Sequence, residues 1–465
     1  MCIRDSSKLA SFKPIKVSQA AQTHAGTYYL VDGEGWINAS DLSTTDNRIE
    51  SVQKVLNEKY NNQERISVYV KQLDTDRVAA INDEKSMYAA SVAKLGVLYY
   101  AQERLSQEKL ALSDEILMKI DKPARYIGNE LNSIKKDKEK VAIRFAMCFP
   151  DVYEIGMSNL GMMILYNMFN EREDVWCERV FSPWMDLDKI MREEHIPLFA
   201  LESQEPVKEF DFLGITLGYE MCYTNVLQVL DLSHVSLLAK DRKEDDPIVI
   251  GGGACAYNPE PIAEFFDMFY IGEGETVYDA LFDAYKANKA AGGSRADFLF
   301  AASQIPGIYV PSLYNVTYKE DGTIASFTPA KEGVPEKVCK QLITDVTKDY
   351  RAIKAPVVPF IKATQDRVTL EIQRGCIRGC RFCQAGMLYR PTRERDVEFL
   401  KQKAIEMLDA TGHEEISLSS LSSSDYSQLP ELVNFLMEEC DRRGVNISLP
   451  SLRIDAFSLD VMKKV

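Results

Sequence analysis

The sequence predicts an α/β protein: a doubly wound domain over residues 120–300, the first units of a parallel (β/α) barrel over 366–465, and a small α+β segment at the start. Three observations lead to this prediction. Short apolar runs ended by glycine alternate with helical patterns over 120–300, the alternation resumes from residue 366, and residues 1–115 share neither texture. Short apolar runs of this kind are typical of buried parallel strands, and their alternation with helices is typical of a parallel sheet.

The predicted doubly wound domain has four clear strands and two clear helices. The strands are VAIRFAMCF, DFLGITLG, PIVIGGG and MFYIGEG, and the helices are LGMMILYNMFNER and TNVLQVLDLSH. Residues 301–365 form a connector, in which the runs around Tyr309 and Tyr314 and the Asp321-Gly322 turn predict a hairpin.

From residue 366 the sequence predicts a βαβαβ series, the opening of a barrel or half-barrel. RVTLEIQ, EEISLSS and VNISLP are the expected strands, and DVEFLKQKAIEMLDATG and SQLPELVNFLMEECDRRG are the expected helices. The first helix ends at a glycine, which is a common helix stop. The last unit is incomplete at Val465, so we expect a truncated core.

Bulk properties narrow the class of protein. A chain of 465 residues is expected to hold two to four domains. The net charge of −15 argues against broad nucleic-acid binding. Because no apolar run reaches 18 residues and no signal peptide is legible, we expect no membrane span and a cytoplasmic protein. Seven of the ten cysteines are scattered singly, which suits a reducing compartment.

The remaining three cysteines, Cys376, Cys380 and Cys383, lie in EIQRGCIRGCRFCQAG. Structural zinc normally takes four protein ligands, and a thioredoxin-like motif needs only two cysteines. Three thiolates suit a 4Fe–4S cluster that leaves one iron open to a substrate or cofactor. Three incidental thiols, or a zinc site with a remote fourth ligand, remain the alternative.

The spacing C-x-x-x-C-x-x-C after a strand resembles the radical S-adenosylmethionine (SAM) superfamily. The resemblance implies that the open iron binds SAM, and that an electron from the cluster, supplied by a donor such as flavodoxin or ferredoxin, yields a 5′-deoxyadenosyl radical. It implies SAM contacts from Phe382, from Ser419 and Ser420 at the second strand end, and from Arg453 at the third. Ordinary loop hydroxyls and a surface arginine are the alternative. The basic run of Arg374, Arg378 and Arg381 is expected to offset the cluster charge, or to be a solvated loop.

The doubly wound domain resembles cobalamin-binding domains, in which D-x-H-x-x-G follows the first strand. Here FPDVYEIGMSNLG has Tyr in the His position. With KPARYIGNELNS, GGGACAYNPEP and GEGE, the chain from about residue 122 resembles an uncharacterised family of radical SAM proteins with a cobalamin-binding-like domain. A scaffold without cobalamin is the alternative. The candidate cobalamin residues are Asp151, Tyr153, Gly156, Thr216, Gly251, Gly252 and Gly253.

The first part of the chain resembles something else. Residues 49–118 contain Ser91 and Lys94 in an S-x-x-K motif and resemble the opening of class A β-lactamase-like serine hydrolases. Residues 1–48 resemble a small wall-associated β-barrel repeat. The later S-D-N and K-T-G motifs of such hydrolases are missing, so Ser91 and Lys94 form an isolated pair. We expect a chimera truncated at both ends; the alternative is a real fusion with a recruited binding module.

The sequence thus favours a radical SAM enzyme whose cofactors are a 4Fe–4S cluster, SAM and cobalamin. The expected reaction is a radical methylation or rearrangement of an unidentified substrate. Two other hypotheses stay open. One is an extracellular serine hydrolase or peptidoglycan-associated protein, and the other is a non-catalytic iron–sulfur or corrinoid carrier.

Overall fold

The computed structural model describes residues 17–23, 26–31, 35–38, 68–71, 78–81, 111–348 and 353–453. The chain divides into two compact units, Met1–Gly96 and Val97–Val465. Ser91, Lys94 and most of the predicted hydrolase-like segment lie outside the described residues.

The first unit contains two small antiparallel sheets. One has the order β1-β2-β3, and the other pairs β4 with β5. The runs GTYYLV and GWIN form β2 and β3. The strands are β1 (Val17–Thr23), β2 (Gly26–Val31), β3 (Gly35–Asn38), β4 (Val68–Lys71) and β5 (Val78–Ile81).

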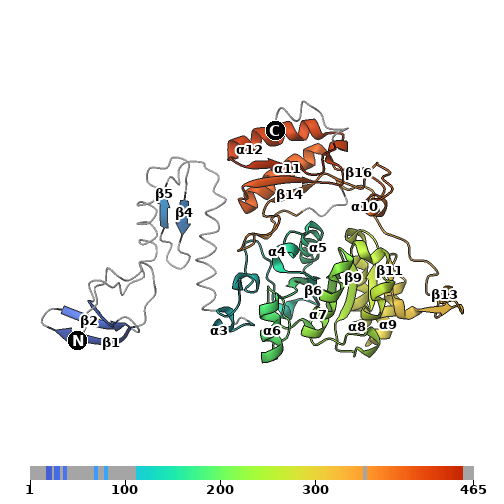
Figure 1. Cartoon of the computed structure of the whole chain (residues 1–465), viewed down its shortest axis with the longest axis horizontal. Coiled ribbons are helices and arrows are strands. Elements are labelled where there is room, and N and C mark those ends of the chain that lie inside the picture. Colours follow the sequence, from blue (N-terminus) through green and yellow to red (C-terminus); the bar gives the residue numbers. More distant parts are fainter. Residues whose placement is uncertain are drawn as a thin grey trace. The chain divides into compact units, whose positions relative to one another are not determined.

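The second unit begins with a six-stranded sheet of order β11-β10-β9-β8-β6-β7, in which only β11 is antiparallel (Figure 1). The chain starts in β6, goes to β7 on one side and then crosses to β8 on the other, as doubly wound folds do. All four predicted strands are present. The strands are β6 (Ile143–Phe149), β7 (Val175–Phe181), β8 (Phe212–Thr216), β9 (Ile248–Gly252), β10 (Met268–Tyr270) and β11 (Ile308–Tyr309).

The helices of this domain include both predicted ones, LGMMILYNMFN as α5 and the TNVLQVLDL run within α7. The segment before β6 belongs to the same body, because Leu112 and Ile120 are buried in the core of the sheet domain. The helices are α3 (Asp114–Leu117), α4 (Tyr153–Gly156), α5 (Leu160–Asn170), α6 (Met185–Glu194), α7 (Tyr223–Leu232), α8 (Tyr278–Ala290) and α9 (Arg295–Ser303).

Aromatic rings join the sheet to three of its helices. Phe145 of β6 lies 4.9 Å from Phe169 of α5 and 5.9 Å from Phe282 of α8, between ring centroids. Phe212 of β8 contacts Phe298 of α9 at 5.9 Å. Edge-to-face pairs of this kind add to the free energy gained from burying the rings. The sheet is therefore a firm base for the loops at its ends.

Strand β7 was not predicted, because its sequence VWCERVF places Glu178 and Arg179 in its middle. Both side chains are completely buried. Arg179 donates to Glu202 (2.6 Å) and to Glu130 (2.6 and 3.0 Å), so its charge is paired inside the protein. Charged residues that are paired inside the protein thus stand where a buried strand usually has apolar residues, and the pattern by which a strand is recognised is missing.

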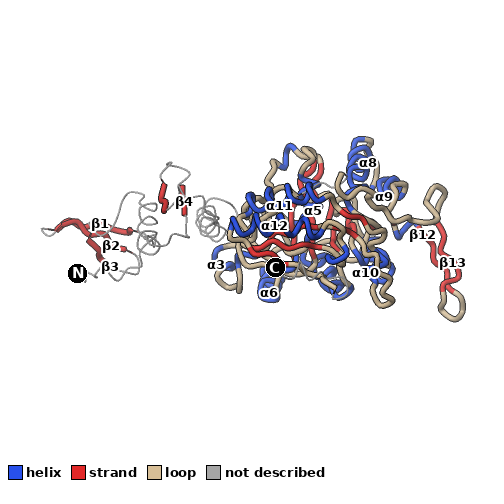
Figure 2. Tube along the Cα trace, turned by 90° about the horizontal axis from the view of Figure 1, so that it is seen from above, coloured by secondary structure: helices blue, strands red, loops and turns tan. Residues whose placement is uncertain are grey.

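The predicted hairpin is confirmed as β12 (Tyr314–Tyr318) and β13 (Ile324–Pro329), with Gly322 at φ +79° in the turn. The two strands extend away from the six-stranded sheet (Figure 2).

The predicted βαβαβ series is also confirmed. Its parallel sheet has the order β14-β17-β18, and α11 and α12 end at Gly412 and Gly444, which adopt the left-handed conformation of helix C-caps. A short pair, β15 with β16, flanks the cysteine segment. The elements are β14 (Val368–Glu371), β15 (Gln373–Arg374), α10 (Gln384–Leu388), β16 (Arg393–Glu394), α11 (Val397–Thr411), β17 (Glu415–Ser419), α12 (Leu429–Arg443) and β18 (Asn446–Ser448).

Within the parts of the chain that the structure describes, no helix has both the length and the apolar character needed to cross a membrane.

Candidate functional site

A cavity of about 520 Å³ lies where the carboxyl ends of β8 and β9 meet the second sheet. Its wall comes from three places: these strand ends, the start of α5 with the loop Gly272–Glu275, and the ends of β14 and β17. In open α/β sheets the crevice beyond the carboxyl ends of the strands, beside the point where strand order reverses, is the usual ligand site. The position and volume are therefore those of a small-molecule site.

Glycines let a ligand approach the backbone of this cavity. A methyl group added at Gly252 would meet nothing closer than the Tyr278 hydroxyl at 3.9 Å, so this position borders open space. Gly253 has φ +107°, which L side chains rarely adopt. Thr216, Gly252 and Gly253, three of the predicted cobalamin residues, line the cavity, whereas Gly251 packs against Phe269.

The other predicted cobalamin residues do not line the cavity. Tyr153 is 1% exposed, and its hydroxyl donates to Glu130 at 2.8 Å. Burial, together with the Glu130 carboxylate, raises the pKa of Tyr153 far above its ordinary value. Asp151 accepts a hydrogen bond from the Tyr219 hydroxyl, and Gly156 lies against the ring of Phe181. These three residues of the loop therefore make contacts within the sheet domain.

The segment KPARYIGNE (122–130) binds the loop after β6 through its charged side chains. Arg125 donates to both carboxylate oxygens of Glu154 (2.9 and 2.8 Å), and Lys122 donates to one of them (3.0 Å). Glu130 accepts from Arg179 and Tyr153. The segment thus fastens the loop after β6 to β7.

The three predicted cluster cysteines lie on one loop, between β15 and α10. All three are partly exposed free thiols. The amide of Arg378 donates to the Cys376 sulfur (3.4 Å), and the amide of Gly386 donates to the Cys383 sulfur (3.3 Å), which caps α10. Amide donors to sulfur are one of the means by which proteins tune iron–sulfur clusters, so the donor set fits a cluster. Over the described ranges, no three His, Cys, Asp or Glu side chains are gathered around one metal position.

The predicted SAM residues fall into two groups. Ser419 and Ser420 line the cavity at the end of β17, and the Ser420 hydroxyl accepts from the amide of Ser422 (3.0 Å). Phe382 is 92% exposed and lies outside the cavity wall, as does Arg453, whose amide donates to the Ser424 hydroxyl. The structure therefore brings the serines to the cavity and leaves Phe382 and Arg453 beyond it.

Gln373 was not predicted, although it lies in the cavity wall and is 2% exposed. Its amide nitrogen donates to the carbonyl of Ser422 at 2.7 Å, which fixes the orientation of the side chain. Its Oε1 atom has no hydrogen-bond partner among the described residues. A buried acceptor without a donor is uncommon in native proteins and is consistent with a nearby ligand site.

The basic run beside the cysteines is paired and is not a solvated loop throughout. Arg378 donates to Asp425 from the loop after β17 (2.9 Å), and this hydrogen bond lowers the pKa of Asp425. Arg374 is 10% exposed and is bound by carboxylates, whereas Arg381 is exposed.

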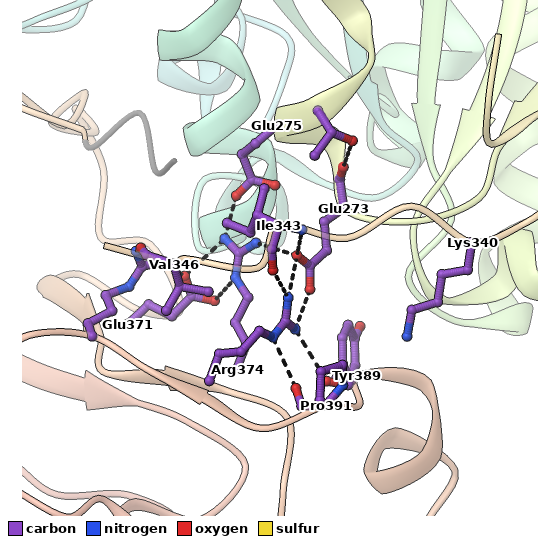
Figure 3. Close-up of polar contacts among 12 residues, drawn as sticks. Glu273, Glu275, Lys340, Ile343, Val346, Glu371, Arg374, Tyr389 and Pro391 are labelled. Atoms are coloured by element: carbon purple, nitrogen blue, oxygen red, sulfur yellow. Dashed lines mark hydrogen bonds and ion pairs between the residues drawn. The ribbon is translucent and has the colours of Figure 1, made fainter. Parts of the chain in front are cut away.

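Three carboxylates and three guanidinium groups form a network beside the cysteine segment (Figure 3). Glu273 accepts two hydrogen bonds from Arg393 (2.8 and 2.6 Å) and one from the amide of Ile343 (2.9 Å). Burial opposes ionisation of Glu273, but these donors outweigh it and hold its pKa below the ordinary value. Glu371 pairs with Arg374 and Arg395 in the same way.

This network was missed in the sequence. The G-E-G-E run was noted only as part of a family pattern, and the arginines on either side of the cysteines as a charge balance. Residues about 100 positions apart in the chain meet here, for example Glu275 with Arg374. The alternation of glycine and glutamate after β10 could have indicated a functional loop, but it does not indicate which arginines Glu273 and Glu275 would pair with.

Comparisons with known proteins agree with the cysteine spacing. Residues 161–311 match the family model described as "Radical SAM proteins, N-terminal", and residues 370–465 match the radical SAM superfamily. The chain therefore carries radical SAM N-terminal and radical SAM domains. Enzymes with radical SAM domains use a 4Fe–4S cluster and SAM. Residues 47–148 match the "Beta-lactamase enzyme family" model.

One curated relative is "Uncharacterized protein MJ0966" of Methanocaldococcus jannaschii, which is 28% identical over 333 residues. The match covers 70% of this chain and 58% of the relative, so the chain spans less than two thirds of that protein's length.

Similar solved structures include the radical SAM methyltransferase TsrM from Kitasatospora setae with tryptophan and a SAM analogue (TM-score 0.40, 12% identity, 69% of this chain and 57% of that one). TsrM with cobalamin and a 4Fe–4S cluster gives a TM-score of 0.39 at 12% identity, covering 70% and 57%. The cobalamin-dependent radical enzyme OxsB gives 0.40 at 11% identity, covering 90% and 53%.

Proposed function

We propose that this protein cleaves SAM reductively and uses the resulting radical on a small substrate bound in the cavity between the two sheets. The observation that carries the proposal is the three-cysteine segment between the end of β14 and α10, beside a cavity at the carboxyl ends of both parallel sheets. Cys376, Cys380 and Cys383 would hold the cluster. When bound, the cluster supplies the electron that breaks the S–C5′ bond of SAM.

The protein's own groups would orient the ligands. Ser419 and Gln373 lie where the cavity meets the end of β14, near Gly375, which precedes Cys376, and would offer hydroxyl and amide groups to SAM. The apolar wall of Phe145, Met147 and Ile250 would exclude water, as a radical reaction requires.

Cobalamin is proposed as a second cofactor, with radical methylation or rearrangement as the reaction class. The support is the glycine-lined strand edge with Thr216, Gly252 and Gly253, which would let a large planar ligand lie against the backbone. Tyr153 would not act as a ligand, because its hydroxyl is buried and already bonded to Glu130.

The remaining expectations also stay proposals: a cytoplasmic location, an electron donor such as flavodoxin or ferredoxin, and no membrane or broad nucleic-acid partner.

Anaerobic reconstitution with iron and sulfide tests the main proposal. We expect a brown protein that, once reduced, converts SAM to 5′-deoxyadenosine, and we expect Cys380→Ala to lose this activity. Cys440→Ala is the control, because this buried thiol lies in α12 away from the segment. Cluster formation and SAM cleavage that persist in Cys380→Ala would refute the ligand assignment.

A serine hydrolase is the second candidate, because the match to the β-lactamase family model includes Ser91 and Lys94. A fluorescent β-lactam should label the chain if this candidate is right, and Ser91→Ala should abolish labelling. We also propose that the chain before about residue 112 derives from a separate gene, since Leu112 already packs in the core of the first sheet domain. Amplification of the source DNA across codons 105–130 would contradict this if one molecule spans them.

A further inference from the structure

Two other parts of the chain hold the cysteine segment (residues 376–383) at both of its ends. These are the G-E-G-E loop (272–275) of the first sheet domain and the connector (338–347). We propose that Glu273, Glu275 and Lys340 are positioning residues, which fix the ends of the cysteine segment and so set the arrangement of its three thiols. The inference rests on the proposed function, since it concerns the same cluster site.

The incoming end of the segment is fixed through Arg374, two residues before Cys376. Its guanidinium donates to Glu371 (2.9 and 3.0 Å), pairs with Glu275, and lies 3.4 Å from an oxygen of Glu273. Three carboxylates therefore surround one guanidinium group, two of them from a different domain.

Gly375 makes this anchor effective for the cysteine that follows. It has φ +80°, and an added methyl carbon would lie 2.6 Å from the carbonyl oxygen of Tyr389 and 2.7 Å from that of Pro391. The backbone that joins Arg374 to Cys376 is thus packed directly on the chain that leaves the segment. A shift of Arg374 would be passed on to Cys376.

The outgoing end is fixed through α10, which begins at its cap Cys383. The Lys340 ammonium donates to the carbonyl of Leu388, the last residue of this helix, and to that of Arg390, at 2.7 Å each. A cation at a helix carboxyl end is favoured by the helix dipole and satisfies carbonyls that lack helical partners. Lys340 thereby ties the helix that starts at Cys383 to the connector.

Glu273 joins the two ends, since it contacts both Arg374 and Arg393. The side chains of Glu273, Arg374 and Arg393 are 9%, 10% and 8% exposed, so water screens their attraction little. Removing the charge of Glu273 would take from Arg393 its carboxylate partner, which is costly at a buried site, and would leave Arg374 with Glu275 and Glu371 alone. Arg393 would then shift, and the two ends of the cysteine segment would no longer be held by one carboxylate.

These contacts are not needed to build either sheet. The first sheet has its own apolar core. The second sheet packs on its helices through buried apolar residues such as Leu370 of β14, Leu408 of α11 and Leu436 of α12. Loss of the network should therefore change the segment while both sheets stay folded.

The experiment compares Glu273→Gln with Glu205→Gln in the full chain. Glu205 is a matched control, because it also accepts from two cations, Lys138 and Arg144, but within the first sheet domain. In the cluster-free protein, iodoacetamide alkylation of Cys376, Cys380 and Cys383 is followed by peptide mass spectrometry. In the reconstituted protein, iron affinity and the electron paramagnetic resonance spectrum with and without SAM are measured.

We expect Glu273→Gln to alkylate at changed relative rates among the three cysteines, to bind the cluster about 10- to 100-fold more weakly, and to alter the spectrum with SAM. Glu205→Gln should match the unmodified chain in all three. Identical alkylation and iron binding in the two variants would overturn the proposal. Should Glu273→Gln fail to fold, Lys340→Met decides, since unchanged alkylation of Cys383 in that variant also overturns it.

The result separates the two proposals. If the unmodified chain binds no iron, the proposed function fails, while the alkylation pattern still decides whether Glu273 positions the segment. If it binds iron and the variants do not differ, the proposed function stands and the positioning role is refuted.

Discussion

Replacing Arg179 by methionine should destabilise the first sheet domain by about 3–5 kcal/mol, the usual cost of removing one partner of a buried ion pair. The Arg179 side chain is completely buried, and Glu130 and Glu202 are 1% and 0% exposed. Without the guanidinium, each carboxyl must bind a proton or remain as a buried charge. At pH 7, protonating a group with an ordinary pKa near 4.3 costs about 3.7 kcal/mol. Retained hydrogen bonds, such as that from Tyr153 to Glu130, keep the total below twice that value.

Urea unfolding followed by tryptophan fluorescence measures this effect, because Trp176 lies buried in β7 and donates to the carbonyl of Ile134. In the variant, both carboxyl groups have a folded pKa above the unfolded value. The native state then holds extra protons, so the stability deficit shrinks as pH falls from 7 toward 4.3. Arg192→Met is the control, since Arg192 is 46% exposed and its pairs should contribute less than about 1 kcal/mol. A deficit for Arg179→Met below about 1 kcal/mol, or one independent of pH, would refute the reasoning.

Three further predictions concern pH, the cavity and the cysteine segment. Burial raises the pKa of Glu178 to about 7 despite its contacts with Arg144. Because the folded pKa lies above the unfolded one, the stabilisation of the folded state by protonated Glu178 is complete below about pH 4.3 and is lost as pH rises through 7. Glu178→Gln should therefore flatten the decline of the urea unfolding midpoint between pH 5 and 8. Gly252→Leu should fill the cavity and cut ligand affinity at least tenfold in a titration, with a thermal midpoint within a few degrees of the unmodified chain, because this position borders open space; unchanged affinity would place the ligand elsewhere. Gly375→Ala should impair iron uptake, because the added methyl would overlap two carbonyl oxygens at φ +80°; normal iron binding would show that the backbone there can shift.

Local sequence features determined most elements of the region from residue 120 onward. Short apolar runs indicated β6, β8, β9 and β10, the last three of them closed by glycine, and the helix stops at Gly412 and Gly444 indicated the ends of α11 and α12. These features act between residues close in the chain, so they can be recognised without knowing the fold. The cysteine spacing was of the same kind, and it alone indicated the cluster chemistry.

Tertiary structure decided whatever depends on distant partners. Strand β7 was hidden because Glu178 and Arg179 are polar in the sequence, and only pairing across the fold makes their burial tolerable. Tyr153 could be matched to a motif position by sequence, but its contact with Glu130 shows that it belongs to the interior of the domain. The pairing of Glu273 with Arg374 and Arg393 could not be predicted either. A sequence does not show which acidic and basic residues will meet, and here the fold brings together residues about 100 positions apart.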